Sequence, residues 1–397
     1  MNKTVVLSLA AAAVLSASSL NGAFAEGKAS GQIRMAYVTQ NNDVDTDTYG
    51  TSIGGILKYE TAPWNDIKLG VGAYVSQKLH FATGNTDEGR ANPDLFGDNI
   101  SSYAYVGEGY IDYSADDITL RIGRQRIDTP FADSDDIRMH PNTFESAIAT
   151  YKGIDDTTLI GGYITRWAGY DSENDISKFK KIVPESNGAA VFGILNESVE
   201  HLELQGWYYG IDKLTDIFYT DASYTIPFNK TTGLEFVGQG IKFKEENGSG
   251  VDGNVYGIGA NLTIGMFTLG TAYNEASNEA GKFVISGLGN GAYLVDTEEM
   301  NLDNFEDIKA YMFSAELDME EAGLEGLTLT AIYAGFKSAP ADMKEKEIDL
   351  IATYEITKSL SAEVNYAILN DQNNNTSEDG LYSGGYDRFL VRVNYNF

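Results

Sequence analysis

The last fourteen residues of the chain, GGYDRFLVRVNYNF, alternate between apolar and polar side chains, as an extended strand between two different environments does. One face of this strand is entirely apolar and carries Phe389, Val391, Val393, Tyr395 and Phe397. At the edge of a soluble sheet such a face is an aggregation hazard. In the wall of a membrane barrel it faces lipid. The alternation therefore favours a transmembrane β-barrel over a soluble β-sandwich or solenoid.

Segments with the same period recur along the chain and predict an all-β fold of antiparallel strands in up-and-down order. We expect eighteen strands, and sixteen if one hairpin is miscounted. The expected strands are 29–40, 52–60, 67–76, 103–114, 118–126, 144–152, 157–168, 188–195, 201–211, 215–226, 233–244, 253–263, 266–274, 308–318, 326–337, 346–355, 359–369 and 385–397.

The connections between these strands alternate between short and long. Turns such as 115–117 and 357–359 are tight. The long loops are 80–101, 127–143, 169–187, 275–307 and 370–384. Outer-membrane barrels have short periplasmic turns and long external loops. With an even number of strands, both termini then lie on the periplasmic side.

Residues 1–25 form a predicted signal peptide, in which Lys3 precedes an apolar run and Ala23-Phe24-Ala25 matches a cleavage site. The expected mature chain, residues 26–397, has no apolar run near the roughly 20 residues that a membrane helix needs. Only helices and closed barrels satisfy every backbone group in lipid, so a membrane location requires a barrel. No low-complexity linker divides the mature chain. We expect one barrel domain in the outer membrane of a Gram-negative cell.

Charge and composition exclude several classes of function. The formal net charge is −30, and it becomes −31 once Lys3 is removed with the signal peptide. Such a chain has no electrostatic reason to bind nucleic acid. It has no cysteine, and its three histidines show no metal-ligand spacing. We therefore expect no cofactor.

Both charges are concentrated in the loop at residues 127–143 and in the strand before it. Pro130 and Pro141 bracket this loop and prevent it from continuing a central strand. The charged residues are Arg121, Arg124, Arg126, Asp128, Asp133, Asp135, Asp136 and Arg138. A polar, kinked loop with both charges suits a place where small solutes are screened, although a solvated surface loop has the same composition.

If apolar positions face lipid, six basic residues fall on the lumen side of their strands. They are Arg34, Lys68, Arg121, Arg166, Arg388 and Arg392. The first and last strands become neighbours when a barrel closes, so we expect arginines along one wall, opposite the aspartates of the loop. The resulting transverse field would orient a carboxylate or zwitterion. The alternative for each arginine is an ion pair that stiffens the wall, and Arg124 and Arg126 belong to the rim or the loop.

Several motifs resemble OprD-type outer-membrane porins. They are RIGRQ at 121–125, DTP at 128–130, DDIR at 135–138, PNTF at 141–144, DIKAY at 307–311 and GLEGLTLTAIYAGF at 323–336. The resemblance implies an eighteen-stranded barrel whose third external loop folds inward beside an arginine-rich wall that conducts amino acids, peptides or small carboxylates. In such proteins the terminal strand, here with Tyr395 and Phe397, is the signal read by the barrel assembly machinery. The acidity of this chain departs from an anion-selective channel, so cation-tolerant diffusion stays open.

Other readings remain open on the sequence alone. A barrel enzyme needs a nucleophile with a base and an orienting group, and no histidine has such a neighbour at a recognisable spacing; we expect no enzyme. A structural or adhesive surface protein would use the long loops for binding. Asp43, Asp45 and Asp47 resemble half of an EF-hand loop and form a weak calcium candidate, because Gly54 stands where the loop needs a glutamate.

The expected partners are outer-membrane lipid, the barrel assembly machinery and small hydrophilic solutes, and a homotrimer is an open possibility. One external segment, FVISGLGNGAYLV at 283–295, is unusually apolar. It is expected to fold onto the rim or partly cover the mouth, or else to form an extra hairpin.

Overall fold

The computed structural model describes residues 17–172, 175–289, 291–373 and 384–397. Within these residues, eighteen antiparallel strands form the wall of one closed barrel, which confirms the predicted fold class and strand number. The wall strands are β1 (Lys28–Asn42), β2 (Thr48–Glu60), β3 (Ile67–Lys78), β4 (Tyr103–Ala115), β5 (Ile118–Gln125), β8 (Thr143–Ile154), β9 (Thr157–Ala168), β11 (Ala189–Val199), β12 (Leu202–Ile211), β13 (Thr215–Pro227), β14 (Thr232–Glu245), β15 (Gly253–Ile264), β16 (Phe267–Ser277), β17 (Ile308–Asp318), β18 (Leu327–Ser338), β19 (Met343–Glu355), β20 (Leu360–Asp371) and β21 (Tyr386–Asn396).

The remaining elements are short. Helix α1 (Leu20–Ala25) belongs to the end of the predicted signal peptide, whose residues 1–16 lie outside the described residues. None of the helices in the described residues is long and apolar enough to cross a membrane. The other short elements are β6 (Asp128–Thr129), β7 (Ala132–Asp133), β10 (Lys180–Lys181), η1 (His80–Ala82), η2 (Asp98–Ile100), η3 (Tyr170–Ser172) and η4 (Glu320–Ala322).

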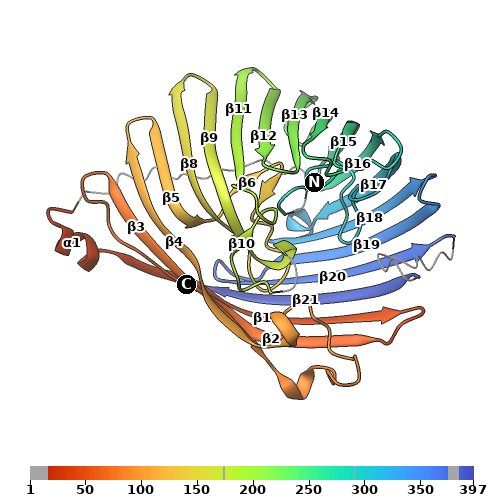
Figure 1. Cartoon of the computed structure of the whole chain (residues 1–397), viewed down its shortest axis with the longest axis horizontal. Helices are drawn as coiled ribbons and strands as arrows, with labels where there is room; N and C mark the ends of the chain where they lie inside the picture. The colour runs from red at the N-terminus through yellow and green to blue at the C-terminus, as the bar shows by residue number, and fades with distance from the viewer. Residues whose placement is uncertain (1–16, 173–174, 290, 374–383) are drawn as a thin grey trace.

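The barrel closes where the first strand meets the last. Consecutive wall strands pair with one another in chain order, and β1 pairs with β21 (Figure 1). On β1, Ile33 and Met35 are about half exposed, whereas Arg34 between them is 2% exposed. Because side chains alternate between the two faces of a strand, the apolar face points outward and the polar face points into the lumen.

The outward face of the wall has the composition expected of a surface in contact with lipid. Large apolar and aromatic side chains are exposed on every side of the barrel, for example Val71, Phe192, Tyr256 and Phe313. An apolar outer band with aromatic residues at its borders is characteristic of outer-membrane barrels. The start of β1 and the end of β21 lie at the end of the barrel where the short turns are. We call the opposite end, where the described parts of the long loops begin, external.

In the described part of the chain, long stretches of the external loops fold into the lumen and fill part of it. Three of these loops are called L2 (residues 79–102), L3 (residues 126–142) and L7 (residues 278–307). Phe131 at the tip of L3 is 1% exposed. Its ring packs edge-on against Tyr209 and Phe243 of the wall, with ring centroids 5.6 Å apart in each case, and against Tyr293 of L7. The hydrophobic core of this barrel is therefore built between loops and wall, inside the lumen.

Loops L3 and L7 also share backbone hydrogen bonds. The Leu288 amide donates to the Phe131 carbonyl at 3.0 Å, and the Asp133 amide donates to the Leu288 carbonyl at 2.9 Å. Val284 and Val295 in the same loop are fully buried. The apolar segment 283–295 is thus neither an extra wall hairpin nor a flap on the rim. It is apolar because it packs within the lumen.

Candidate functional site

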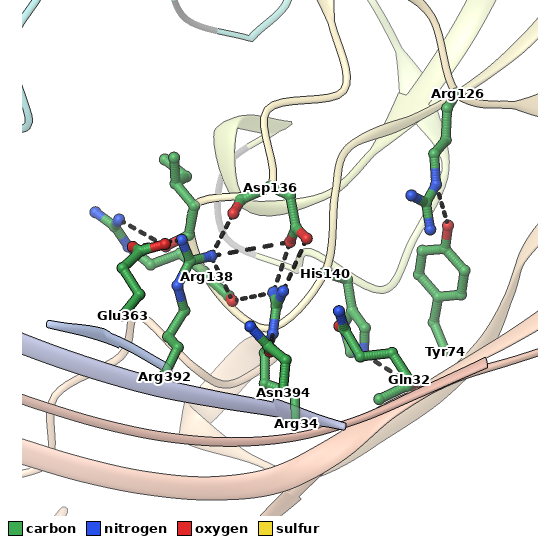
Figure 2. A network of polar contacts seen from close by, with 12 residues as sticks. Gln32, Arg34, Tyr74, Arg126, Asp136, Arg138, His140, Glu363, Arg392 and Asn394 are labelled. Carbon is green, nitrogen blue, oxygen red and sulfur yellow. Dashed lines mark hydrogen bonds and ion pairs between the residues drawn. The ribbon is translucent and has the colours of Figure 1, made fainter. Parts of the chain in front are cut away.

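The seam between β1 and β21 holds L3 by means of Arg34. Its guanidinium donates to both carboxylate oxygens of Asp136, at 2.6 and 2.8 Å, and to the carbonyl of Arg138 at 2.7 Å. Its Nε donates to Asn394 of β21 at 2.6 Å. The Arg34 side chain is only 3% exposed. This arginine therefore fixes the loop to the wall and is not free to bind a solute (Figure 2).

Two arginines of β21 extend the same arrangement. Arg392 donates to the backbone carbonyl of Asp136 and, at 2.6 Å, to Glu363 of β20. Arg388 lies 2.9 Å from Asp94 of L2 and 2.5 Å from Glu299 of L7. Each of the three inward-folded loops is therefore attached to the β1–β21 side of the barrel.

Electrostatics keep the L3 attachment charged over a wide pH range. Burial alone would raise the pKa of Asp136, but the adjacent Arg34 guanidinium together with the charges of Arg392 and Arg126 outweighs that effect and lowers the pKa. Arg138 of the same loop lies over the Tyr170 ring, 4.3 Å from its centroid, and 3.4 Å from Asp94. An Asp136 carboxylate that stays ionised maintains the L3 attachment near neutral pH.

His140 of L3 is a buried, neutral structural residue. Its Nε2 lies 3.0 Å from the Val75 carbonyl and 3.2 Å from the Gly55 carbonyl, so this nitrogen is the donor. Its Nδ1 then accepts from the Tyr103 hydroxyl at 2.8 Å. Burial lowers the pKa of His140 to about 4, and the Arg34 charge acts in the same direction.

A second set of basic residues lines strands β2 to β5 and the start of L3. Arg126 lies 3.5 Å from Glu108 and donates to the Tyr74 hydroxyl at 3.2 Å. Lys58 also pairs with Glu108, at 2.9 Å. These cations are more open than those at the seam, because the Arg126 side chain is 41% exposed. Figure 2 shows Arg126 standing apart from the Arg34 cluster.

The expected separation of charges across the lumen does not hold for the seam arginines. Arg34, Arg388 and Arg392 lie on the inward face as their parity indicates, yet their carboxylate partners are in direct contact with them. The ion-pair alternative describes these three residues. Asp136 of L3 keeps 38% of its side chain exposed and Glu363 of β20 keeps 27%, so these two acidic groups at the seam are open to a solute.

Arg166 does not follow the expected parity. Glu145 pairs with Arg166 and Ser146 with Ile164, so Thr165 is an extra residue in a β-bulge. Such a bulge reverses the facing of the residues beyond it. Ile164 and Trp167 are buried while Arg166 is exposed. This correction could not be made from the sequence, because no residue there marks a bulge.

The other predicted residues occupy varied positions. Arg121 pairs with Asp112 on the lumen side of β5 at 2.6 Å, and Lys68 is half-buried in register with the same aspartate. Arg124 stacks on Phe179, 4.1 Å from the ring centroid, and lies 3.6 Å from Glu145.

Three predicted aspartates serve the fold of L3. Asp128 and Asp133 face one another in the β6–β7 hairpin, and the Asp133 carboxylate accepts from the Asp135 amide at 2.9 Å. Their arrangement shapes the loop locally, whereas Asp136 connects it to the wall.

Sequence reasoning missed the carboxylates that complete the site. Asp94, Glu108, Glu299 and Glu363 come from two loops and two strands far apart in the chain. On β4 and β20 the inward parity of Glu108 and Glu363 was a usable signal. Asp94 and Glu299 gave none, because their loops were expected outside the barrel.

The acidic run in the first external loop does not form a recognisable metal site. Asp47 accepts from the Asn42 amide at 3.0 Å, which closes the turn between β1 and β2. In the described part of the chain, no three His, Cys, Asp or Glu residues are grouped so as to hold a metal ion. The calcium hypothesis therefore gains no support from the positions of Asp43, Asp45 and Asp47.

Comparisons with known proteins agree on one family. The sequence profile of the family described as "outer membrane porin, OprD family" matches residues 22–397. None of the curated proteins matches the chain. Among solved structures, the chain is similar to Pseudomonas aeruginosa OccK9 (OpdG), with a TM-score of 0.79 and 17% identity over 94% of this chain and 99% of that one. It is also similar to Acinetobacter baumannii OccAB2, with a TM-score of 0.78 and 19% identity over 93% and 98% of the two chains. A third similar structure is that of Pseudomonas aeruginosa OpdK with vanillate, with a TM-score of 0.77 and 17% identity over 95% and 100%.

Proposed function

The chain belongs to the OprD family of outer-membrane porins, and we propose that its channel selects small solutes carrying a carboxylate, amino acids foremost. Membership of this family makes the protein a Gram-negative outer-membrane channel for small solutes. The choice of solute rests on the charges that the inward-folded loops leave accessible.

One observation carries the proposal: the accessible charges near L3 have opposite signs and come from different parts of the lumen. Arg126, with Lys58 and Arg121 nearby on β2 and β5, supplies partly exposed cations. Asp136 and Glu363 at the seam supply partly exposed carboxylates. A zwitterion between them can place its carboxylate toward Arg126 and its ammonium toward Asp136. An arginine side chain can donate two parallel hydrogen bonds to a carboxylate. A solute with one charge finds only half of this arrangement.

Two further points support a carboxylate-bearing solute. The similar OpdK structure was solved with vanillate, which is a small aromatic carboxylate. Against a simple anion channel stands the net charge of −30, because an acidic protein repels anions at long range. A zwitterion avoids this conflict since it has no net charge.

Planar-bilayer recording tests the proposal. An arginine about 6 Å from a passing carboxylate, at an effective dielectric constant of about 50, contributes about 1 kcal/mol. Arg126→Gln is therefore expected to lower the permeability of glutamate relative to potassium about 5-fold, measured from reversal potentials, and that of glycine by a similar factor, measured by liposome swelling. Arg124→Gln removes the same charge from the same strand region, where the arginine is stacked on Phe179, and serves as the matched control.

The outcomes separate the two levels of the proposal. If Arg126→Gln conducts amino acids as the Arg124→Gln channel does, the role of Arg126 in solute selection is refuted while channel activity remains. If wild-type protein forms no conducting channel in the bilayer, the transport function itself fails.

We also propose roles for other parts of the chain. Residues 1–25 act as a signal peptide and 26–397 form one domain, with 127–143 as the constriction loop. Tyr395 and Phe397 act as the assembly signal, since both are exposed at the end of the closing strand. A homotrimer is compatible with the apolar wall. His140 has no catalytic role, because both of its ring nitrogens are already hydrogen-bonded.

A further inference from the structure

Strand β19 carries opposite charges on its two faces near its external end. Its sequence there is MKEKEIDL, residues 343–350. Glu345 and Glu347 point inward and are 3% and 0% exposed, whereas Lys344 and Lys346 lie on the outward face. The inward acids belong to the lumen, where L7 docks on Glu347. The outward lysines have no part in the channel.

The outward lysines continue across the neighbouring strands. Lys309 of β17 stands directly opposite Lys337 of β18, and Lys337 stands directly opposite Lys344 of β19. Like charges in directly opposed positions destabilise a sheet. We call Lys309, Lys337, Lys344 and Lys346 the lysine row.

The lysine row forms few ion pairs, although the chain has more acidic than basic residues. Lys309 pairs with Glu275 at 2.7 Å. Within the described residues, Lys337, Lys344 and Lys346 form no ion pair within 4 Å. The chain contains 58 acidic and 28 basic residues, so acidic partners were available in quantity. Three unpaired lysines side by side indicate an anion from outside the chain.

The row lies at the height of lipid headgroups. On β17, Tyr311 and Phe313 follow Lys309 on the outward face, and on β18 Tyr333 precedes Lys337. Aromatic residues of this kind mark the border of the hydrocarbon layer in outer-membrane barrels. The lysines are two to four residues beyond that border on the external side, where lipid phosphates are found.

An apolar groove lies further down on the same group of strands. It has a volume of about 480 Å³, and its floor is shallow because Ala315, Ala331 and Ala352 project little from β17, β18 and β19. Leu329, Leu350 and Val364 form its sides. From Lys309 to Ala315 is six residues, which is roughly 20 Å along a strand. At a strand tilt of about 40°, the groove is about 15 Å deeper than the row, which is close to the middle of a bilayer.

We propose that the outer face of β17–β20 binds a phosphorylated lipid with several acyl chains in the external leaflet. Its phosphates contact the lysine row, and one acyl chain lies in the alanine-floored groove. Lysine ammonium groups are compact point charges that suit phosphate. The strand tilt also displaces the groove sideways by roughly 13 Å relative to the row, a separation that favours a broad lipid with several chains. The site is independent of which solute the channel conducts.

Native mass spectrometry of the full-length protein in detergent tests this proposal. The probe is a bis-phosphorylated, multiply acylated disaccharide lipid, compared with the same lipid after removal of its phosphates. A basic residue near an anionic lipid surface contributes roughly 5-fold in affinity. The variant Lys337→Gln/Lys344→Gln/Lys346→Gln is therefore expected to weaken binding of the phosphorylated lipid about 100-fold, and removal of the phosphates is expected to have a similar effect on wild type.

A matched control carries the same change of charge at the opposite end of the barrel. Lys152→Gln/Lys230→Gln/Lys358→Gln alters three exposed lysines at the periplasmic turns and is expected to bind as wild type does. In the groove, Ala331→Phe points outward and leaves the lysines intact. It is expected to weaken binding about 4-fold for each methylene that it excludes.

Several results would overturn the proposal. Equal affinity of the two triple variants would show that the lysine row binds no phosphate. Equal binding of the phosphorylated and dephosphorylated lipids would show the same. If a single cysteine placed at Ala331, or in a separate variant at Leu350, forms a cross-link between subunits, this face is covered by a second copy of the chain instead of lipid. Heat-modifiable migration in gel electrophoresis checks that each variant is a folded barrel.

Discussion

Replacing Arg34 with methionine is expected to release L3 from the wall without opening the barrel. Methionine keeps an apolar stem of similar length and removes the guanidinium, which makes three contacts to L3 and one to Asn394. Breaking a fully buried ion pair costs about 3–5 kcal/mol. Because the Asp136 side chain is 38% exposed, water takes up part of that cost. At about 1 kcal/mol for each lost contact to L3, the loop is destabilised by about 3 kcal/mol.

Amide hydrogen exchange measures this effect. A loss of about 3 kcal/mol increases the population of released L3 roughly 150-fold, so peptides from residues 126–142 exchange faster by a similar factor at pH 7. Arg392 still donates to the Asp136 backbone, so the loop opens more often but is not detached. In single-channel recordings the same variant is expected to show a larger mean conductance and more current noise.

The control is Asp136→Asn, which keeps an oxygen that can accept from Arg34 and leaves the contacts to Arg138 and Asn394 in place. It is expected to cost about 1–2 kcal/mol, and the double variant about as much as Arg34→Met alone, since both changes break the same interaction. Exchange of L3 in Arg34→Met within 3-fold of wild type would refute the reasoning. So would strictly additive effects of the two substitutions.

Three further predictions concern the loops in the lumen. Burial lowers the pKa of His140 to about 4. The neutral His140 side chain therefore stabilises L3 fully above pH 6.5, and this stabilisation is lost as the pH falls toward 4. Amide exchange of L3 is expected to reveal a loss of about 2 kcal/mol at pH 4.5. Burial raises the pKa of Asp303 in L7 to about 6. The protonated Asp303 side chain therefore stabilises L7 fully below pH 3.8, and this stabilisation is lost as the pH rises through 6. Asp303→Asn is expected to stabilise L7 by about 3 kcal/mol at pH 7 and so to slow its amide exchange, and an unchanged exchange rate would contradict this prediction. Gly289→Ala is expected to separate L7 from L3, because a Cβ there meets the Asp133 carbonyl. Gly281 also has a positive φ but has open space around it, so equal conductance of Gly289→Ala and Gly281→Ala would exclude the steric explanation.

The wall of this barrel could be predicted from the sequence because each strand separates two solvents. Lipid on one side and a water-filled lumen on the other make apolar and polar residues alternate along a strand. Ile33, Arg34 and Met35 show this alternation. All eighteen strands were therefore found within a few residues of their observed ends. The same rule failed at Arg166, because one extra residue in a bulge reverses the parity without leaving a mark in the composition.

The candidate site was harder to predict because its partners are distant in the chain. Arg388 contacts Asp94, 294 residues earlier, and Glu299, 89 residues earlier. Neither contact has a local signature, since each depends on the path of a long loop. The apolar residues of 283–295 did signal burial, yet only the structure shows that their environment is the lumen, where they pack beside Phe131.

The β1–β21 seam also links the attachment of L3 to the closure of the barrel. Arg34 comes from the first strand, and Arg392 and Asn394 come from the last. The set of side chains that holds L3 at the seam is therefore complete only after β1 and β21 have paired. Complete attachment of L3 at the seam therefore reports that the two ends of the chain have met. The packing of Phe131 on Tyr209 and Phe243 does not depend on that closure.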